Sequence, residues 1–342
     1  MKFLKYVFSI GFIVSLAVLA FYFYVFQTKN IVKKSFDLYI PTGADYSVIL
    51  DSLRQNGVLK DLRSFDFAAR LMKYPALVKP GKYHITDNLT NKELIHMLRT
   101  GIQIPVRVTF NNISFFEELS KILSQHLESD SATFLVHFNA ENTSRKYGFT
   151  KETFPLMFIP DTYEFYWNTS PEKFTQKMHD NYKRFWNEEH IRKASKVGLS
   201  PEEVGILASI VESETKKADE MPIVAGLYLN RLRRNIPLQA DPTVVYATQL
   251  QRGIRTKRVY FKDLMIDSPY NTYMYKGLPP GPILFPSKTA LMAVLEAKEH
   301  SYIYMCADPS RPGYHLFTSD YQEHLKNAAR YRAWLTSTNI VN

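Results

Sequence analysis

The stretch SPEEVGILASIVESET, residues 200–215, predicts a helix that ends in two closely spaced carboxylates. Ser200 is the expected N-cap, Pro201 suits the first helical position, and Glu203 completes a capping box. Apolar and small residues then run as far as Glu212 and Glu214. Glutamates are almost never fully buried unless they are paired. These two are therefore the first candidates for a functional site.

The two carboxylates are expected to face different surroundings. At about 100° per helical residue, Glu214 falls within an apolar face, and Glu212 falls beside small residues that a ligand or another segment can approach. An apolar environment raises a carboxyl pKa, so Glu214 is expected to keep a proton near neutral pH and to donate it to a leaving oxygen. Two alternatives stay open: the helix end unwinds into water, or Glu214 pairs with a buried arginine such as Arg231.

The N-terminal residues 1–30 predict one membrane-spanning helix. Lys2 and Lys5 are followed by a run without charge from Tyr6 to Phe26, which is long enough for a span of about 20 residues. The run ends in FYFYVF rather than in small residues, which favours a retained anchor over a cleaved signal peptide. Lysines also follow the span at positions 29, 33 and 34, so charge bias alone does not fix the topology.

Composition and charge limit the classes of function. The 342 residues are 45% hydrophobic and 22% charged, a globular composition that is large enough for two domains. The formal net charge of +10 favours anionic partners, but no nucleic-acid motif accompanies the dispersed basic residues. Nucleic acid is therefore not expected as a partner. The single Cys306 excludes an internal disulfide and is expected to be a small core residue.

The pattern of elements predicts an α+β fold with a small module and a larger domain. Residues 31–103 read as a strand, two helices, a second strand and a third helix, and residues 104–342 form the larger, mixed unit. In the larger unit we expect one long amphipathic helix over 171–197. The segments FIPDTYEFYW (158–167) and LQADPTVVYA (238–247) are expected to be irregular loops.

Familiar catalytic motifs other than the carboxylates are missing from the sequence. It contains no HExxH pair, no zinc-spaced cysteines and histidines, no GxSxG elbow and no P-loop. We therefore predict neither a metal nor a cofactor. The loops near the carboxylates are rich in Asn, Asp, Tyr, Thr and Gln, side chains that stack on sugar rings and bond to their hydroxyl and acetamido groups. By elimination, glycan chemistry is the leading hypothesis.

Six sequence blocks resemble one known family. ASIVESET, LNRL, LQADPTVVYA, SPYNTY, GLPPGPI and HLFT occur in this order behind a single N-terminal span, and PDTYEF matches a block ahead of the catalytic helix. Together they closely resemble the MltG/YceG-like family of endolytic murein transglycosylases. Two small departures are Ser213, where a Lys is common, and Ala240, where a Thr is common.

The resemblance implies a location, a domain order and a catalytic residue. It implies a bacterial inner-membrane protein with a cytoplasmic tip, whose body lies outside the cytoplasm and contains a LysM-like module followed by the catalytic domain. Matched to the family's E-x-E-T segment, the essential acid is Glu214, and Glu212 is its companion.

The resemblance also implies a reaction and its partners. The family cuts nascent peptidoglycan strands between N-acetylmuramic acid and N-acetylglucosamine without water, leaving 1,6-anhydro ends and terminating elongation. Peptidoglycan synthases, the penicillin-binding proteins, are candidate partners. Two rivals are a hydrolase and a membrane-anchored scaffold that binds glycan or a synthase without catalysis.

Further polar and aromatic residues are candidates for binding glycan or for fixing the loops around it, and the sequence leaves both roles open for each. They are Tyr163, Asn230, Arg231, Gln239, Asp241, Thr243, Tyr246, Asn271 and Tyr273. His315 is expected to be a core residue of its strand rather than an acid.

Overall fold

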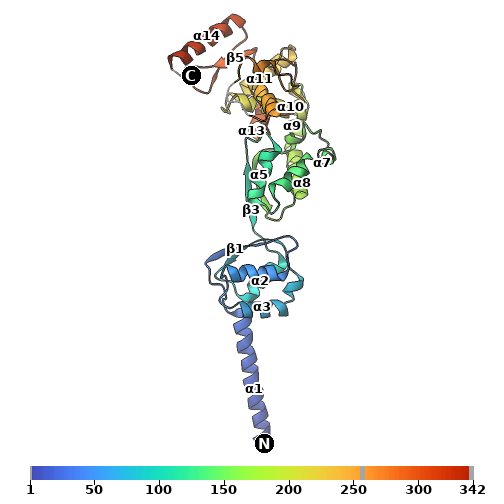
Figure 1. Ribbon diagram of the computed structural model, residues 1–342, viewed down its shortest axis with the longest axis vertical. Coiled ribbons are helices and arrows are strands. Elements are labelled where there is room, and N and C mark those ends of the chain that lie inside the picture. Colours follow the sequence, from blue (N-terminus) through green and yellow to red (C-terminus); the bar gives the residue numbers. More distant parts are fainter. Residues whose placement is uncertain (1, 255–258, 339–342) are drawn as a thin grey trace. The chain divides into compact units, whose positions relative to one another are not determined.

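The computed structural model describes residues 2–254 and 259–338, which form a mixed α+β structure (Figure 1). The chain divides into two compact units. The first comprises Met1–Val108, Ser124–Ser129 and Glu164–Ser170, and the second comprises Thr109–Leu123, Asp130–Tyr163 and Pro171–Asn342. Among the described residues, the strands pair into three two-stranded sheets, β1–β2, β3–β4 and β5–β6.

The N-terminal helix fits the predicted single-pass anchor. Helix α1 (Lys2–Tyr22) continues into a π-helical turn, η1 (Phe23–Gln27). The segment Phe3–Gln27 has a mean hydropathy of 2.2 and is long and apolar enough to cross a membrane. Its apolar side chains are largely exposed, which is the state expected of a helix whose partner is lipid.

The first unit contains the small module, whose helices and strands follow the predicted order. Asp45 and Asp61 cap two of its helices, Thr90 and Glu93 form a capping box on the third, and Gly101 ends that helix in a left-handed conformation. Buried apolar side chains from all of the module's helices and strands form one core. The elements are β1 (Ser35–Ile40), α2 (Tyr46–Gln55), α3 (Leu62–Leu71), η2 (Tyr74–Ala76), β2 (Gly81–Thr86) and α4 (Asn91–Thr100), with β1 and β2 antiparallel.

Between residues 105 and 197 two predictions were wrong. The expected loop over 158–167 contains strand β4, which pairs with β3, and the expected helix over 171–197 is two helices. Asn187 separates these helices, because its side chain accepts the backbone N–H of His190 and caps the second one. The elements are β3 (Pro105–Phe110), α5 (Phe116–His126), α6 (Ser131–Asn139), α7 (Glu141–Lys146), η3 (Phe154–Met157), β4 (Asp161–Tyr166), α8 (Pro171–Phe185) and α9 (Glu188–Val197).

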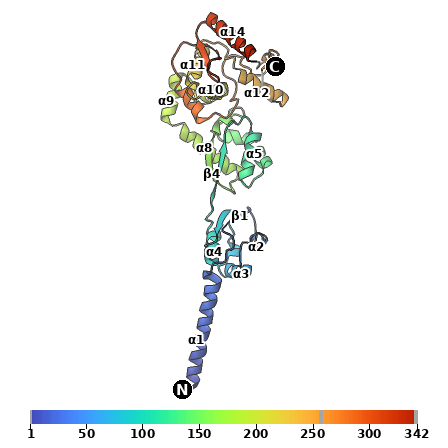
Figure 2. The same ribbon diagram turned by 90° about the vertical axis from the view of Figure 1, so that its left-hand side faces the viewer.

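Helix α10 (Pro201–Glu214) lies at the centre of the second unit (Figure 1, Figure 2). It packs against α9, α11 (Met221–Arg233), α12 (Asp241–Arg252) and α13 (Lys288–Leu295). Every residue from Val204 to Glu212 is buried, so the expected single apolar face is wrong: the helix is enclosed on all sides. The loop expected over 238–247 is largely the start of α12, where Pro242 stands in a first turn that tolerates proline. A short turn, η4 (Asp263–Met265), follows α12.

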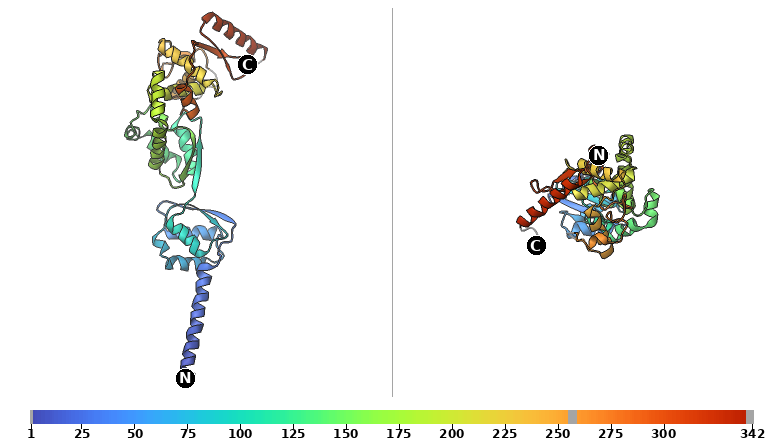
Figure 3. Two further views of the ribbon diagram at one scale, coloured as in Figure 1. Left: turned by 180° about the vertical axis from the view of Figure 1, so that it is seen from behind. Right: turned by 90° about the horizontal axis from the view of Figure 1, so that it is seen from above.

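The C-terminal part is a β-hairpin followed by a helix. Strands β5 (Tyr304–Ala307) and β6 (His315–Thr318) are antiparallel, with Tyr304 opposite Thr318. Helix α14 (Tyr321–Ser337), red in Figure 3, packs on this hairpin. Cys306 lies on β5 and is only partly buried.

Candidate active site

Glu214 is the last residue of α10, and the next residue leaves the helix. The helix begins as predicted, with Ser200 as N-cap and reciprocal capping by Glu203, and it ends where Thr215 takes an extended conformation. The Glu214 carboxyl therefore stands at the carbonyl end of a buried helix, where the helix dipole disfavours negative charge.

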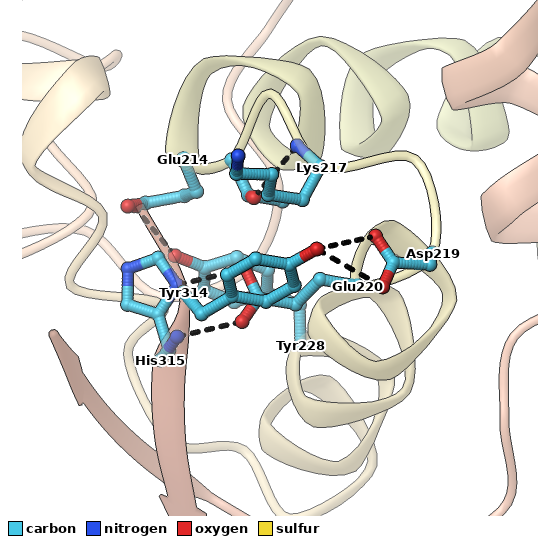
Figure 4. A network of polar contacts seen from close by, with 8 residues as sticks. Glu214, Lys217, Asp219, Glu220, Tyr228, Tyr314 and His315 are labelled. Carbon is cyan, nitrogen blue, oxygen red and sulfur yellow. Dashed lines mark hydrogen bonds and ion pairs between the residues drawn. The ribbon is translucent and has the colours of Figure 1, made fainter. Parts of the chain in front are cut away.

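A buried tyrosine bonds directly to the candidate acid. The Tyr228 hydroxyl, on α11, donates a 2.7 Å hydrogen bond to Oε1 of Glu214 (Figure 4). Burial raises the pKa of Glu214 from 4.5 to about 7, opposed by the Tyr228 hydrogen bond; Asp241 raises this pKa further and Arg231 lowers it. The residue is nevertheless partly exposed. Such a carboxyl can hold a proton near neutral pH and still be reached by a ligand.

Glu212 has a different environment from Glu214. The residue is 9% exposed, and its Oε2 accepts the backbone N–H of Ser287 at 2.8 Å, at the N-cap of α13. The small residues of α10 beside Glu212 are covered by the segment that leads into α13, because Ser209 Oγ accepts the Ile283 N–H at 3.0 Å. Glu212 thus fastens α13 to α10.

Arg231 does not form the ion pair with Glu214 that the sequence left open as an alternative. It is buried, and its guanidinium donates to the backbone carbonyls of Ile303, Pro237 and Leu238 at 2.7–3.1 Å and to Gln239 Oε1 at 3.3 Å. Burial lowers the pKa of Arg231. The arginine ties the segment before α12 to the hairpin, and it acts on Glu214 only through space.

Most of the other candidates near α12 hold its first turn in place. Tyr273 Oη donates to Asp241 Oδ1 at 2.5 Å. Burial is the largest cause that raises the pKa of Tyr273, followed by Asp241 and then Glu214. Thr243 Oγ1 forms a hydrogen bond with Thr272 Oγ1 at 2.9 Å. Asn271 is fully buried, and its side chain donates hydrogen bonds to the carbonyls of Leu264 and Ile266. The Gln239 backbone has a left-handed conformation, with φ 50°, and its N–H donates a hydrogen bond to the Thr272 carbonyl.

Three candidates are engaged elsewhere. Asn230 donates to the carbonyls of His300 and Tyr302. Tyr163 donates to the Ile159 carbonyl and stacks on Phe110. Tyr246 stacks on Phe115, with ring centroids 5.2 Å apart. The structure therefore gathers Glu214, Arg231, Asp241 and Tyr273 around one point and gives these three side chains other contacts.

Sequence reasoning missed Tyr228 and a second polar pair. Tyr228 lies in an apolar stretch of α11, and the signal was available, because a buried tyrosine hydroxyl usually needs a partner. Glu220 is 3% exposed and binds both the backbone N–H of His315, at 2.6 Å, and its Nδ1, at 3.0 Å (Figure 4). His315 is thus half-buried and paired with an acid, rather than an apolar-packed core residue.

The described acidic side chains near Glu214 are not arranged as a metal site. Within residues 2–254 and 259–338, no cluster of three or more His, Cys, Asp or Glu side chains is arranged to hold a metal ion. The nearby Glu212 carboxylate accepts a backbone N–H, whereas burial raises the pKa of Glu214 to about 7.

Comparisons with known proteins agree on one family. The YceG-like family matches residues 38–330. An endolytic murein transglycosylase of Bacillus subtilis (strain 168) is 32% identical over 316 residues, covering 87% of this chain and 85% of that protein. An endolytic murein transglycosylase of Streptococcus pneumoniae serotype 2 is 26% identical over 328 residues, and the chain spans 59% of its length.

A crystal structure supports the fold. A yceG-like protein from Listeria monocytogenes superposes with a TM-score of 0.57 at 23% identity, covering 86% of this chain and 99% of that one. Because the family match extends over most of the sequence, the chain belongs to the YceG-like family.

Proposed function

We propose that this chain is an endolytic murein transglycosylase, a lyase that acts on peptidoglycan, with Glu214 as its catalytic residue. Relatives from Bacillus subtilis and Streptococcus pneumoniae carry that name. The observation that carries the proposal is a single partly exposed carboxyl whose pKa burial raises to about 7. An acid with that pKa is suited to both halves of a proton transfer near neutral pH.

In the first step Glu214 donates its proton to the oxygen that joins N-acetylmuramic acid to the next sugar. The C1–O bond breaks, the leaving sugar departs as an alcohol, and the muramic acid ring passes through an oxocarbenium-like state. Tyr228 holds the carboxyl in place, and its hydrogen bond stabilises the carboxylate that forms.

In the second step the C6 hydroxyl of the same muramic acid attacks C1, and the Glu214 carboxylate takes the hydroxyl proton. A 1,6-anhydro ring forms, no water is added, and the acid returns to its protonated state. Ordinary glycosidases need a second carboxylate as nucleophile or base. Here one carboxyl serves both steps, and Glu212 stays bonded to Ser287.

The remaining proposals concern location and partners. We propose that residues 1–30 anchor the chain in a membrane, supported by the apolar helix Phe3–Gln27. By the family resemblance, we propose that this is the bacterial inner membrane and that the body lies outside the cytoplasm. We propose that the compact module of residues 31–103 is LysM-like and binds glycan. Acting on nascent strands, the enzyme would terminate glycan elongation beside peptidoglycan synthases.

The end groups of the products test the proposal. Full-length protein in detergent micelles is incubated with uncrosslinked glycan, and the fragments are analysed by mass spectrometry. We expect internal cuts whose muramic acid ends are one water lighter than reducing ends. Reducing ends would instead identify a hydrolase, and glycan binding without fragments would identify a scaffold; either result overturns the proposal.

The pH dependence of kcat/KM follows from the raised pKa of Glu214. The acid must be protonated in the free enzyme, so the rate should fall about tenfold per pH unit well above pH 7. Tyr228→Phe removes a hydrogen bond that lowers this pKa, and should move the falling limb to higher pH. Tyr275→Phe, which removes an exposed bond to Asp267, is the control and should leave the limb in place. An unshifted limb in Tyr228→Phe would refute the assignment.

A further inference from the structure

A cavity of about 530 Å³ in the second unit has no assigned role. Its lining comes from the start of α5, the region of α6 and α7, the turn before η3, the outer face of α12 and the segment 270–285. A pocket of this volume with aromatic walls and a few polar groups has the usual character of a ligand site.

Three aromatic rings form one side of the cavity. Phe115 and Tyr246 are stacked with an interplanar angle of 5°, and Tyr246 lies 4.9 Å from Tyr270, centroid to centroid. Phe115 and Tyr246 are partly exposed. Their ring faces carry partial negative charge, which attracts a cation placed against them.

Two carboxylates stand beside these rings. Glu117 and Glu152 are exposed and line the cavity, and neither side chain has an ion pair or hydrogen bond within the described parts of the chain. Burial raises the pKa of Tyr246 most, followed by the neighbouring Tyr270 ring and then by Glu117. Burial also raises the pKa of Tyr270 to about 12, and Glu152 is the second cause of that rise. Both negative charges therefore act directly on the aromatic wall.

Helix stabilisation and ion pairing account for only part of this negative charge. Glu117 lies in the first turn of α5, where a negative charge stabilises a helix, but Glu152 lies in a turn outside any helix. Glu141, also on the lining, is paired with Arg145 at 2.5 Å. Among the lining residues that the structure describes, Lys151 is the one cation. The described lining of this aromatic cavity therefore carries excess negative charge, on a chain whose net charge is +10.

We propose that this cavity binds a primary ammonium group, held against Tyr246 and Tyr270 and between Glu117 and Glu152. This inference rests on the proposed function for its ligand: the free side-chain amine of the diamino acid in an uncrosslinked peptidoglycan stem peptide. Crosslinking converts that amine into a neutral amide. The cavity would therefore select strands that have not been crosslinked.

The position of the cavity suits a stem peptide next to the cut. Asp241 begins α12 and acts electrostatically on Glu214, and Tyr246 follows on the same helix. At about 1.5 Å and 100° per residue, Tyr246 lies roughly 7.5 Å along α12 from Asp241 and about 140° around the helix. A stem peptide spans up to about 3.3 Å per extended residue, so a stem carried near the scissile bond is long enough to reach the cavity.

The test compares two substrates that differ in one charge. Full-length protein is given uncrosslinked glycan with free stem amines, or the same glycan after N-acetylation of those amines. We expect kcat/KM to be about tenfold higher for the free amine. In the double variant Glu117→Gln/Glu152→Gln this ratio should fall to about 1. In Glu299→Gln, which removes an exposed negative charge away from this cavity, the ratio should stay near tenfold.

A binding measurement separates this inference from the proposed function. Calorimetry with a soluble muropeptide, free or acetylated, needs no turnover and should show the same tenfold difference in Kd. If glycan is cleaved but the two forms react and bind equally, the cavity inference is wrong and the proposed function stands. If no anhydro ends form from either substrate while the Kd difference persists, the proposed function is wrong and the ammonium site stands.

Discussion

Glu214→Gln is expected to lower the rate of anhydro-end formation by at least about a thousandfold. The amide has the shape of the acid and can still accept the Tyr228 hydrogen bond, but it cannot give a proton to the leaving oxygen. General acid–base catalysis contributes about 10² to 10⁴ in rate. Because both proposed steps use this residue, the loss should lie toward the upper end of that range. Single-turnover digestion followed by mass spectrometry measures it.

Stability measurements on the same variant check that it remains folded. The folded-state pKa of Glu214 is raised from 4.5 to about 7, so its ionisation destabilises the protein as pH rises through that window. Glu214→Gln should therefore be the more stable form at pH 8, by on the order of 1–2 kcal/mol after allowing for partial exposure. Wild-type activity in Glu214→Gln would move the catalytic role away from Glu214. The role would move to Glu212 if Glu212→Gln lost activity while Glu214→Gln kept it.

Arg231→Met is expected to cost about 3 kcal/mol of unfolding free energy. Methionine fills a similar volume but donates nothing, so three backbone carbonyls and Gln239 lose their partner in a buried place. The segment before α12 should then loosen, and Asp241 should shift relative to Glu214. Denaturant unfolding measures the stability, and the pH–rate profile reports the shift.

Arg233→Met is the matched control on the same helix. Arg233 is exposed, and its bond to the Val197 carbonyl is long, at 3.5 Å. Its substitution should change stability by less than about 0.5 kcal/mol. If the two variants unfold at the same denaturant concentration, Arg231 does not hold this region together.

Local signals were sufficient to predict the central helix and its N-terminal capping. The capping residues of α10 act within one turn, so the sequence contains the whole interaction. The contrast between Glu212 and Glu214 followed from helical spacing, although the enclosure of α10 on every side did not. Enclosure depends on α9, α11, α12 and α13, and spacing within one helix carries no information about how many neighbours surround it.

The rest of the site depends on contacts between distant residues. Tyr228 and Glu214 are separated by 14 positions in the sequence, and His315 and Glu220 by 95. Hydrophobic periodicity does not predict contacts between residues that lie on different elements. The first turn of α12 was predicted as a loop because Asp and Pro favour turns, yet both also begin helices. Strand β4 was missed because the strand that it pairs with, β3, is separated from it by several helices along the chain.

The placement of Glu214 at the end of an enclosed helix couples interior packing to reaction rate. Any side chain that pushes α10 lengthwise carries the acid with it, and a displacement of about 1 Å can cost a hundredfold in rate. Gly205 shows how little free space surrounds α10, since a methyl group at this position would come within 2.6 Å of the Leu156 side chain. Substitutions in this interior should therefore appear first as lost turnover, in folded protein, at positions that no sugar ever touches.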